Sequence, residues 1–140
     1  MQTFAYPAAV RAIAPDDFEV RFSDLPEVIT GAATEDEALA QAEEALEVAV
    51  EHYIELGQTL PPFRAAKRGE RLIPIAPSVA ARAILAQAMR DQRLSKVALA
   101  DRLHKDEKIV RRILSGKGAS LELTLEALRA VGVRPVLALT

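Results

Sequence analysis

Two arginines, a lysine and a glutamate lie at helical spacing in the second half of the chain. On a helix, these charged residues share one face, which comprises Glu107, Lys108, Arg111 and Arg112. The apolar residues of the same stretch share the opposite face, which comprises Val110, Ile113 and Leu114. Lys and Arg bind DNA phosphates, and Arg can also donate two hydrogen bonds to one base. The pattern therefore favours a helix that enters the major groove of DNA.

The same pattern also fits an ordinary amphipathic helix whose charged face is only solvated. Short helix pairs of this kind are common in all-α domains. The segment alone leaves DNA binding and simple solvation open, and the elements around it have to decide between them.

A short helix directly before this segment is expected to hold it in place. Ser95 can cap that helix, whose small apolar inner face comprises Val97, Ala98, Ala100 and Leu103. The small side chain of Ala100 would let two steeply crossed helices approach closely. The turn contains His104 and Lys105, and Asp106 can cap the second helix. We therefore predict a helix-turn-helix whose DNA-contacting residues are Ser95, Lys96, Lys105, Glu107, Lys108, Arg111, Arg112 and Lys117.

The two halves of the chain differ strongly in charge. Residues 1–70 contain 5 Lys and Arg against 14 Asp and Glu, a net charge of −9, whereas residues 71–140 contain 13 against 6, a net charge of +7. All six aromatic residues also lie in the first half. We therefore predict two small domains, residues 1–76 and 77–140. The chain has no cysteine and no apolar run long enough to span a bilayer, so we expect a cytoplasmic protein without a membrane partner.

Apolar and polar residues in the first domain predict three strands, at residues 2–13, 18–22 and 28–30. Thr34 followed by Glu37 forms a capping box for a helix that ends near Gly57. Residues 71–75 indicate a fourth strand, which Pro74 places at a sheet edge because proline cannot donate to a ladder. The predicted element order is therefore β-β-β-α-β.

The second domain is predicted to be all-α up to its last segment. Ser78 is expected to cap its first helix and Ser120 its last helix, which Gly132 ends. Residues 133–139 form a β-prone strand without a partner in this domain, so we expect pairing with a second copy of the chain. This pairing would produce a homodimer or a higher homo-oligomer. The residues predicted at its interface, called the seam below, are Val133, Pro135, Val136, Leu137 and Leu139. The alternative is a tail packed back on its own domain.

The long helix of the first domain has an almost wholly acidic outer face, which comprises Asp36, Glu43, Glu44, Glu47, Glu51 and Glu55. Like charges four residues apart each destabilise a helix by roughly a few tenths of a kcal/mol. A helix that tolerates this cost is suited to a basic partner.

These features resemble those of the HicB-type antitoxins along nearly the whole chain. In the first half the resemblance rests on Tyr6-Pro7-Ala8, Phe22-Ser23-Asp24-Leu25-Pro26, Thr30, Thr34, Glu37-Ala38-Leu39 and Glu44-Ala45-Leu46. The second half is similar to the family branch with a helix-turn-helix in Met89-Arg90, Leu94-Ser95-Lys96, Leu99-Ala100, Leu103, Asp106-Glu107-Lys108, Val110-Arg111-Arg112 and Leu125. It departs from the common helix-turn-helix pattern at His104 and Lys105, where Gly and an apolar residue are usual.

The resemblance implies an α+β fold in which a degenerate RNase H-like first domain binds and inhibits a small HicA-type mRNA-cleaving toxin. It also implies that the second domain represses the operon that encodes both proteins. We then expect the toxin on the acidic helix face, at Asp36, Glu43, Glu47 and Glu51.

Two other functions stay open on the residues alone: a stand-alone helix-turn-helix regulator whose acidic domain senses another ligand or protein, and a metal-dependent nuclease. A nuclease needs several carboxylates around two Mg²⁺ ions, whereas Asp16, Asp17 and Asp24 fall in predicted turns and Glu19 stands alone on its strand. His104 is better interpreted as a turn residue, because His tolerates a left-handed conformation. We therefore expect no enzyme activity, no catalytic or metal-binding residue and no cofactor.

Overall fold

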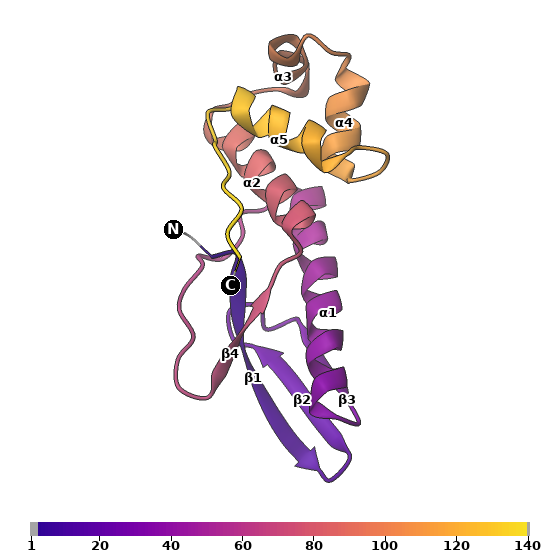
Figure 1. Ribbon diagram of the computed structural model, residues 1–140, viewed down its shortest axis with the longest axis vertical. Helices are drawn as coiled ribbons and strands as arrows, with labels where there is room; N and C mark the ends of the chain where they lie inside the picture. The colour runs from indigo at the N-terminus through magenta and orange to yellow at the C-terminus, as the bar shows by residue number, and fades with distance from the viewer. Residues whose placement is uncertain (1–2, 140) are drawn as a thin grey trace. The chain divides into compact units, whose positions relative to one another are not determined.

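The computed structural model describes residues 3–139, which form a mixed α+β structure with one four-stranded antiparallel sheet and five helices (Figure 1). The predicted α+β class is thus confirmed. Tertiary contacts divide the chain into two compact units. The first unit comprises the chain up to Tyr53 together with Thr59–Ala76, and the second comprises Ile54–Gln58 together with the chain from Pro77 onward. The division of functions between residues 1–76 and 77–140 stays a prediction.

The first unit contains β1 (Ala5–Ala14), β2 (Asp17–Phe22), β3 (Ile29–Ala32), most of α1 (Glu35–Leu56) and β4 (Glu70–Pro74). Its strands are all antiparallel, in the spatial order β3-β2-β1-β4. The predicted β-β-β-α-β order is confirmed. The first strand begins at Ala5 rather than at residue 2, which lies outside the described residues. The predicted cap of α1 is also present, since the Thr34 hydroxyl accepts from the Glu37 N–H at 3.2 Å.

The core of the first unit lies between the sheet and α1 (Figure 1). Arg71 of β4 is paired with Ala8 of β1 and forms an ion pair with Glu35 of α1, so the sheet face that contains Ala8 faces the helix. The buried residues of α1 recur every four positions, at Ala38, Ala42, Leu46 and Val50. This spacing forms one apolar stripe along the helix, and the acidic residues are left on the outer side.

Pro74 lies in an edge strand, as its lack of an N–H predicts. Ile75 donates its N–H to the Phe4 carbonyl at 3.0 Å, so the backbone groups of Ile75 point toward β1. Successive residues of a strand direct their N–H groups to opposite sides, which places the nitrogen of Pro74 on the free edge. The prediction for Pro74 is confirmed.

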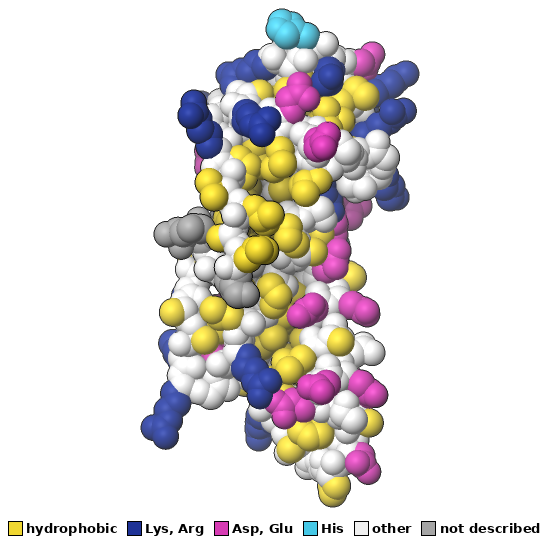
Figure 2. Space-filling model, viewed as in Figure 1, with side chains coloured by type: hydrophobic (Ala, Val, Ile, Leu, Met, Phe, Trp, Pro, Cys, Tyr) yellow, Lys and Arg dark blue, Asp and Glu magenta, His cyan; other side chains and the backbone are white. Residues whose placement is uncertain are grey.

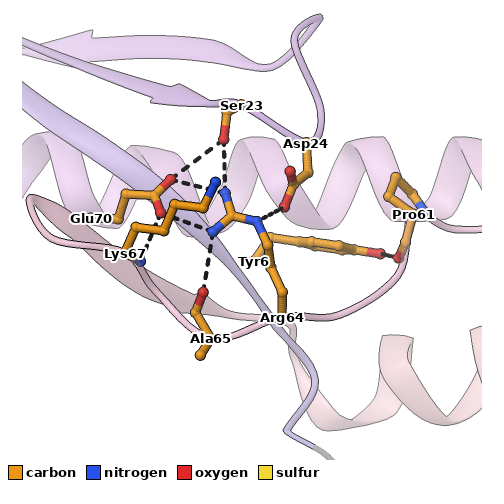
Figure 3. Close-up of polar contacts among 8 residues, drawn as sticks. All are labelled: Tyr6, Ser23, Asp24, Pro61, Arg64, Ala65, Lys67 and Glu70. Carbon is orange, nitrogen blue, oxygen red and sulfur yellow. Dashed lines mark hydrogen bonds and ion pairs between the residues drawn. The ribbon is translucent and has the colours of Figure 1, made fainter.

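Residues 59–69 contain no helix or strand, yet specific contacts hold them to the sheet (Figure 3). The Tyr6 hydroxyl donates to the Pro61 carbonyl at 2.6 Å, and the Tyr6 ring stacks on Phe63 with centroids 4.8 Å apart. Burial raises the pKa of the Tyr6 hydroxyl well above its ordinary value. Arg64 of the same segment contacts Asp24 and Glu70. The segment is therefore an ordered part of the first unit.

The second unit contains α2 (Pro77–Asp91), α3 (Lys96–Leu103), α4 (Glu107–Ser115) and α5 (Leu121–Ala130). Its core joins buried side chains of all four helices, among them Leu85, Leu99, Val110, Ile113 and Leu128. The predicted cap of α5 is confirmed, because the Ser120 hydroxyl accepts from the Leu123 N–H at 3.1 Å. Ala100 is buried in this core, as its small size predicts.

Two local predictions in this unit are wrong. Ser78 does not cap α2, because the helix already begins at Pro77, a residue suited to the first helical position since it lacks an N–H. Val97 does not line the inner face of α3: its side chain is 53% exposed, and Leu99 is buried instead. Within a short helix, packing against the neighbouring helices decides which apolar residues turn inward.

Residues 133–139 form no helix or strand in the single chain, so the predicted strand, which would pair with a second copy of the chain, stays a prediction. Val133 donates its N–H to the Leu128 carbonyl at 2.9 Å and is partly buried against the core. Beyond it the side chains are exposed, to 77% at Val136 and 82% at Leu137. The backbone N–H and C=O groups of a helix are bonded within the helix, so the helices of the second unit offer this segment no strand to pair with.

Candidate DNA-binding helix and acidic helix face

A tight left-handed turn joins α3 to α4. His104 has φ 54° and ψ 41°, in the left-handed region, and its N–H donates to the Asp101 carbonyl at 3.2 Å. The next N–H, of Lys105, donates to the Ala100 carbonyl at 3.0 Å. His104 is therefore the turn residue that the sequence predicts, and it takes the conformation in which Gly is usual.

Both helices of the pair have the caps that their sequences predict. The Ser95 hydroxyl accepts from the Ala98 N–H at 3.1 Å, and the Asp106 carboxylate accepts from the Lys108 N–H at 2.8 Å. These bonds satisfy backbone donors that have no partner within a helix. The first turn of α4 is thus held by its own side-chain cap.

The two faces of α4 are clearly separated. Val110 and Ile113 are fully buried, whereas Lys108, Arg111 and Arg112 are exposed. Glu107 accepts a hydrogen bond from Arg111 at 3.0 Å, one turn further along the helix. Figure 2 shows Lys and Arg side chains gathered around α3 and α4. Positive side chains at the surface attract phosphates, and the Glu107 carboxylate moderates this attraction beside Arg111.

The other predicted DNA-contacting residues are exposed at the ends of the helices. Ser95 uses its oxygen for the cap of α3, but its hydroxyl hydrogen remains available to a phosphate. Lys96 begins α3, Lys105 lies in the turn, and Lys117 follows α4. The structure thus places all eight predicted residues on the α3–α4 segment and its two flanks, each accessible to solvent.

Two arginines of the second unit have roles that sequence reasoning missed. Arg102 of α3 donates to the Ala130 carbonyl at 3.1 Å, at the end of α5. Arg82 of α2 is buried and donates to the Leu114 carbonyl at 3.3 Å, at the end of α4. An arginine among the small apolar residues of α2 is the sequence signal that could have identified Arg82.

Acidic residues lie along the outer side of α1, but this side also exposes Val48 and Leu56, so it is less uniformly acidic than the sequence predicts. Asp36 and Glu43 are exposed, while Glu47 and Glu51 are partly buried. Asp36, Glu43 and Glu47 have no ion-pair partner among residues 3–139. Figure 2 shows Asp and Glu side chains along α1. The helix dipole favours negative residues in the first turn of a helix and disfavours them in the last turn. Glu43 and Glu47 therefore gain nothing from the dipole of α1, and Glu55 in its last turn is disfavoured.

Two features are absent from residues 3–139. No group of three or more His, Cys, Asp or Glu side chains there is arranged to hold a metal ion. No helix in the same part of the chain combines the length and apolar character needed to cross a membrane.

These features define a small α+β protein that combines an acidic helix face with a capped helix pair of basic surface. The chain belongs to the HicB-like antitoxins of bacterial toxin-antitoxin systems, since the model of that family matches residues 5–84. The matched residues include the whole sheet, α1 and the start of α2. This membership confirms the resemblance noted in the sequence.

Two sequence relatives agree with the family assignment. The chain is 33% identical over 114 residues to Antitoxin HicB 2 of Photorhabdus laumondii subsp. laumondii, which covers 81% of each chain. It is 29% identical over 113 residues to Antitoxin HicB 1 of the same bacterium, covering 81% of this chain and 72% of the relative. The crystal structure of the Burkholderia pseudomallei antitoxin HicB matches 81% of this chain and 96% of its own, with 17% identity and a TM-score of 0.44.

Proposed function

We propose that this antitoxin binds and neutralises a small HicA-type mRNA-cleaving toxin through its first unit, and represses the operon of both proteins through its second unit. Both activities would take place in the cytoplasm, where mRNA and DNA are found. The observation that carries the proposal is the placement of an acidic helix face and a basic recognition-type helix in two different units of one HicB-like chain.

Charge supports the toxin-binding part. A protein that cleaves mRNA needs a basic surface to bind phosphates, and the outer face of α1 offers that surface a competing acidic partner. The order of strands and helix supports a degenerate RNase H-like first domain. Asp24 and Glu70 of this unit both bind the guanidinium of Arg64, which compensates their charge and favours an inhibitory over a catalytic domain.

The geometry of α4 supports the DNA-binding part. Its apolar side is anchored in the core, its first turn is capped, and its exposed side contains Lys108, Arg111 and Arg112. A single helix-turn-helix buries little DNA surface, so we propose a homodimer that reads two half-sites. The exposed segment with Val136 and Leu137 is the proposed seam. A stand-alone regulator is not favoured, because the family match covers the first unit.

Two variants of the full chain separate the proposed activities. The double variant Arg111→Ala, Arg112→Ala should no longer repress a reporter gene that is controlled by the DNA upstream of the antitoxin gene. It should still protect cells that express the toxin encoded beside it. The quadruple variant, in which Asp36, Glu43, Glu47 and Glu51 are replaced by the corresponding amides, should still repress the reporter but should protect these cells less. Loss of both activities in each variant would contradict a division of function between the units.

A further inference from the structure

Arg82 is a buried charged residue of the second unit that the proposed DNA contacts do not use. It lies on α2 and is only 7% exposed, so its guanidinium is not available to a DNA phosphate. One of its nitrogens, Nη1, donates to the Leu114 carbonyl at 3.3 Å. This carbonyl belongs to the last turn of α4, 32 residues further along the chain.

The same guanidinium lies against the turn that ends α4. Gly116 adopts a left-handed conformation with φ 71°, and its N–H donates to the carbonyls of Arg112 and Ile113. A Cβ atom on Gly116 would lie 2.6 Å from Cζ of Arg82 and 2.9 Å from Nε and Nη1. Only a residue without a side chain lets the backbone come this close to the guanidinium.

A cation at this place suits the end of a helix. The last carbonyls of a helix have no partner within it and carry partial negative charge. The end of α5 is satisfied in a similar way by Gln92, which directly follows α2, and by Arg102 of α3. Gln92 donates to the Val131 carbonyl at 2.7 Å, and Arg102 donates to the Ala130 carbonyl at 3.1 Å. The side chains that bind these helix ends come from other parts of the unit.

We propose that Arg82 is a positioning residue of the DNA-binding site: it fixes the C-terminal turn of α4 and so sets the orientation in which Lys108, Arg111 and Arg112 meet DNA. The inference rests on the proposed function of α4. A bidentate contact to a base depends on side-chain placement, whereas attraction of phosphates depends mainly on charge. Arg82 therefore supports sequence-specific binding more than general affinity for DNA.

The test compares full-length Arg82→Met with full-length Arg129→Met. Arg129 is an exposed arginine of α5 outside the predicted DNA contacts, so both variants lose the same charge from the same unit. Binding is measured to the DNA upstream of the gene and to random-sequence DNA over a range of salt concentrations. We expect Arg82→Met to lower affinity for the upstream DNA by about tenfold, comparable to one good base contact, and Arg129→Met to have no such effect.

Two further readouts separate positioning from a phosphate contact. Affinity for random-sequence DNA and the slope of log K against log salt should remain as in the unsubstituted chain, because no phosphate contact is lost. Without DNA, the amides of residues 112–116 should exchange with solvent faster in Arg82→Met, while those of α5 keep their protection. The proposal is overturned if Arg82→Met binds the upstream DNA with unchanged affinity. It is also overturned if the variant loses affinity equally for the upstream and the random-sequence DNA and shows a shallower slope of log K against log salt.

A second variant covers the case in which Arg82→Met does not fold. Arg82→Lys keeps the charge and the apolar stem but lacks the planar group that meets both Leu114 and Gly116. We expect a folded protein with faster exchange at residues 112–116 and reduced affinity for the upstream DNA. A folded Lys variant with unchanged exchange would overturn the proposal. If the unsubstituted chain itself bound no DNA, the proposed function would fail, and the exchange experiment would still decide whether Arg82 fixes α4.

Discussion

The guanidinium of Arg64 donates to both carboxylate oxygens of Glu70, at 2.9 and 3.0 Å (Figure 3). It also donates to Asp24 and Ser23, each at 2.9 Å. These partners follow β2 and begin β4, so a single cation joins the irregular segment of residues 59–69 to two parts of the sheet. Such charge-assisted, bidentate contacts are among the stronger hydrogen bonds in proteins.

This network predicts how stability depends on pH. The hydrogen bonds from Arg64, followed by the Lys67 N–H, lower the pKa of Glu70 from 4.5 to about 2. A carboxyl group with a lowered pKa in the folded state stabilises the fold above pH 4.5, and this contribution is lost as the pH falls toward 2. Glu70→Gln should therefore lower Tm at pH 6 to 7, and its Tm should approach that of the unsubstituted chain as the pH falls toward 2.

Thermal unfolding followed by circular dichroism from pH 2 to pH 7 measures this difference. The control is Glu126→Gln, which replaces an exposed glutamate of α5 that has no ion pair among residues 3–139. Its effect on Tm should be small at every pH. A constant Tm difference for Glu70→Gln across this range would contradict the assigned role of the Arg64 contact.

A second prediction concerns the exposed face of α4. Arg111→Ala should weaken binding to the upstream DNA by about 1–3 kcal/mol if Arg111 makes a bidentate contact to a base. Arg112→Ala should reduce the slope of log K against log salt by roughly 0.9 if Arg112 neutralises a phosphate. Fluorescence anisotropy with labelled DNA measures both quantities, with Arg129→Ala as the control. Unchanged binding in the Arg111, Arg112 double variant would rule out α4 as the DNA-contacting helix.

A third prediction concerns Glu107, the negatively charged residue on the same face of α4, whose replacement should strengthen DNA binding. Its carboxylate binds Arg111 and adds a negative charge to the surface that would meet phosphates. Glu107→Gln should raise affinity for random-sequence DNA, because the repulsion is removed and Arg111 becomes free. The same titration measures the change, and reduced affinity for random-sequence DNA would show that the carboxylate does not oppose phosphate binding.

The acidic face of α1 should act mainly on the rate of association with the toxin. Replacing Asp36, Glu43, Glu47 and Glu51 by their amides should slow association by about tenfold at low ionic strength and change dissociation less, because long-range charge guides the encounter. Surface plasmon resonance measures both rates at several salt concentrations. The matched control neutralises four exposed carboxylates elsewhere: Asp16, Asp17, Glu122 and Glu126. Equal slowing in both variants would show that net charge, rather than α1, is responsible.

The segment after Val133 should hold two copies of the chain together. Deleting residues 133–140 should convert a dimer to a monomer and weaken binding to the upstream DNA by roughly 100-fold, since the two half-sites are no longer read together. Residue 140 lies outside the described residues. A milder double variant, Val136→Ser with Leu137→Ser, should also weaken the dimer. Its control is Ile13→Ser with Ile29→Ser, which removes exposed apolar side chains of the first unit and should leave the dimer intact. A truncated chain that remains dimeric by sedimentation would rule out this seam.

Features that depend on neighbours in sequence could be predicted from the sequence alone. The caps by Thr34, Ser95, Asp106 and Ser120 each join a side chain to an N–H two or three residues away, so their spacing is visible in the chain. The edge position of Pro74 followed from its missing donor, and the left-handed turn at His104 from the tolerance of His for that conformation. The class of fold and the two candidate surfaces were predictable for the same reason.

Only the tertiary structure decided the features that depend on which surfaces meet. Arg64 and Asp24 are 40 residues apart, Arg82 and Leu114 are 32 apart, and no local spacing relates either pair. Packing against the neighbouring helices decides that the side chain of Leu99, and not that of Val97, is buried. Residues 133–139 form no strand in the single chain because the second unit offers no strand to pair with. Helical and strand periodicity determines which residues share a face, whereas the partner of that face is determined by how the elements pack.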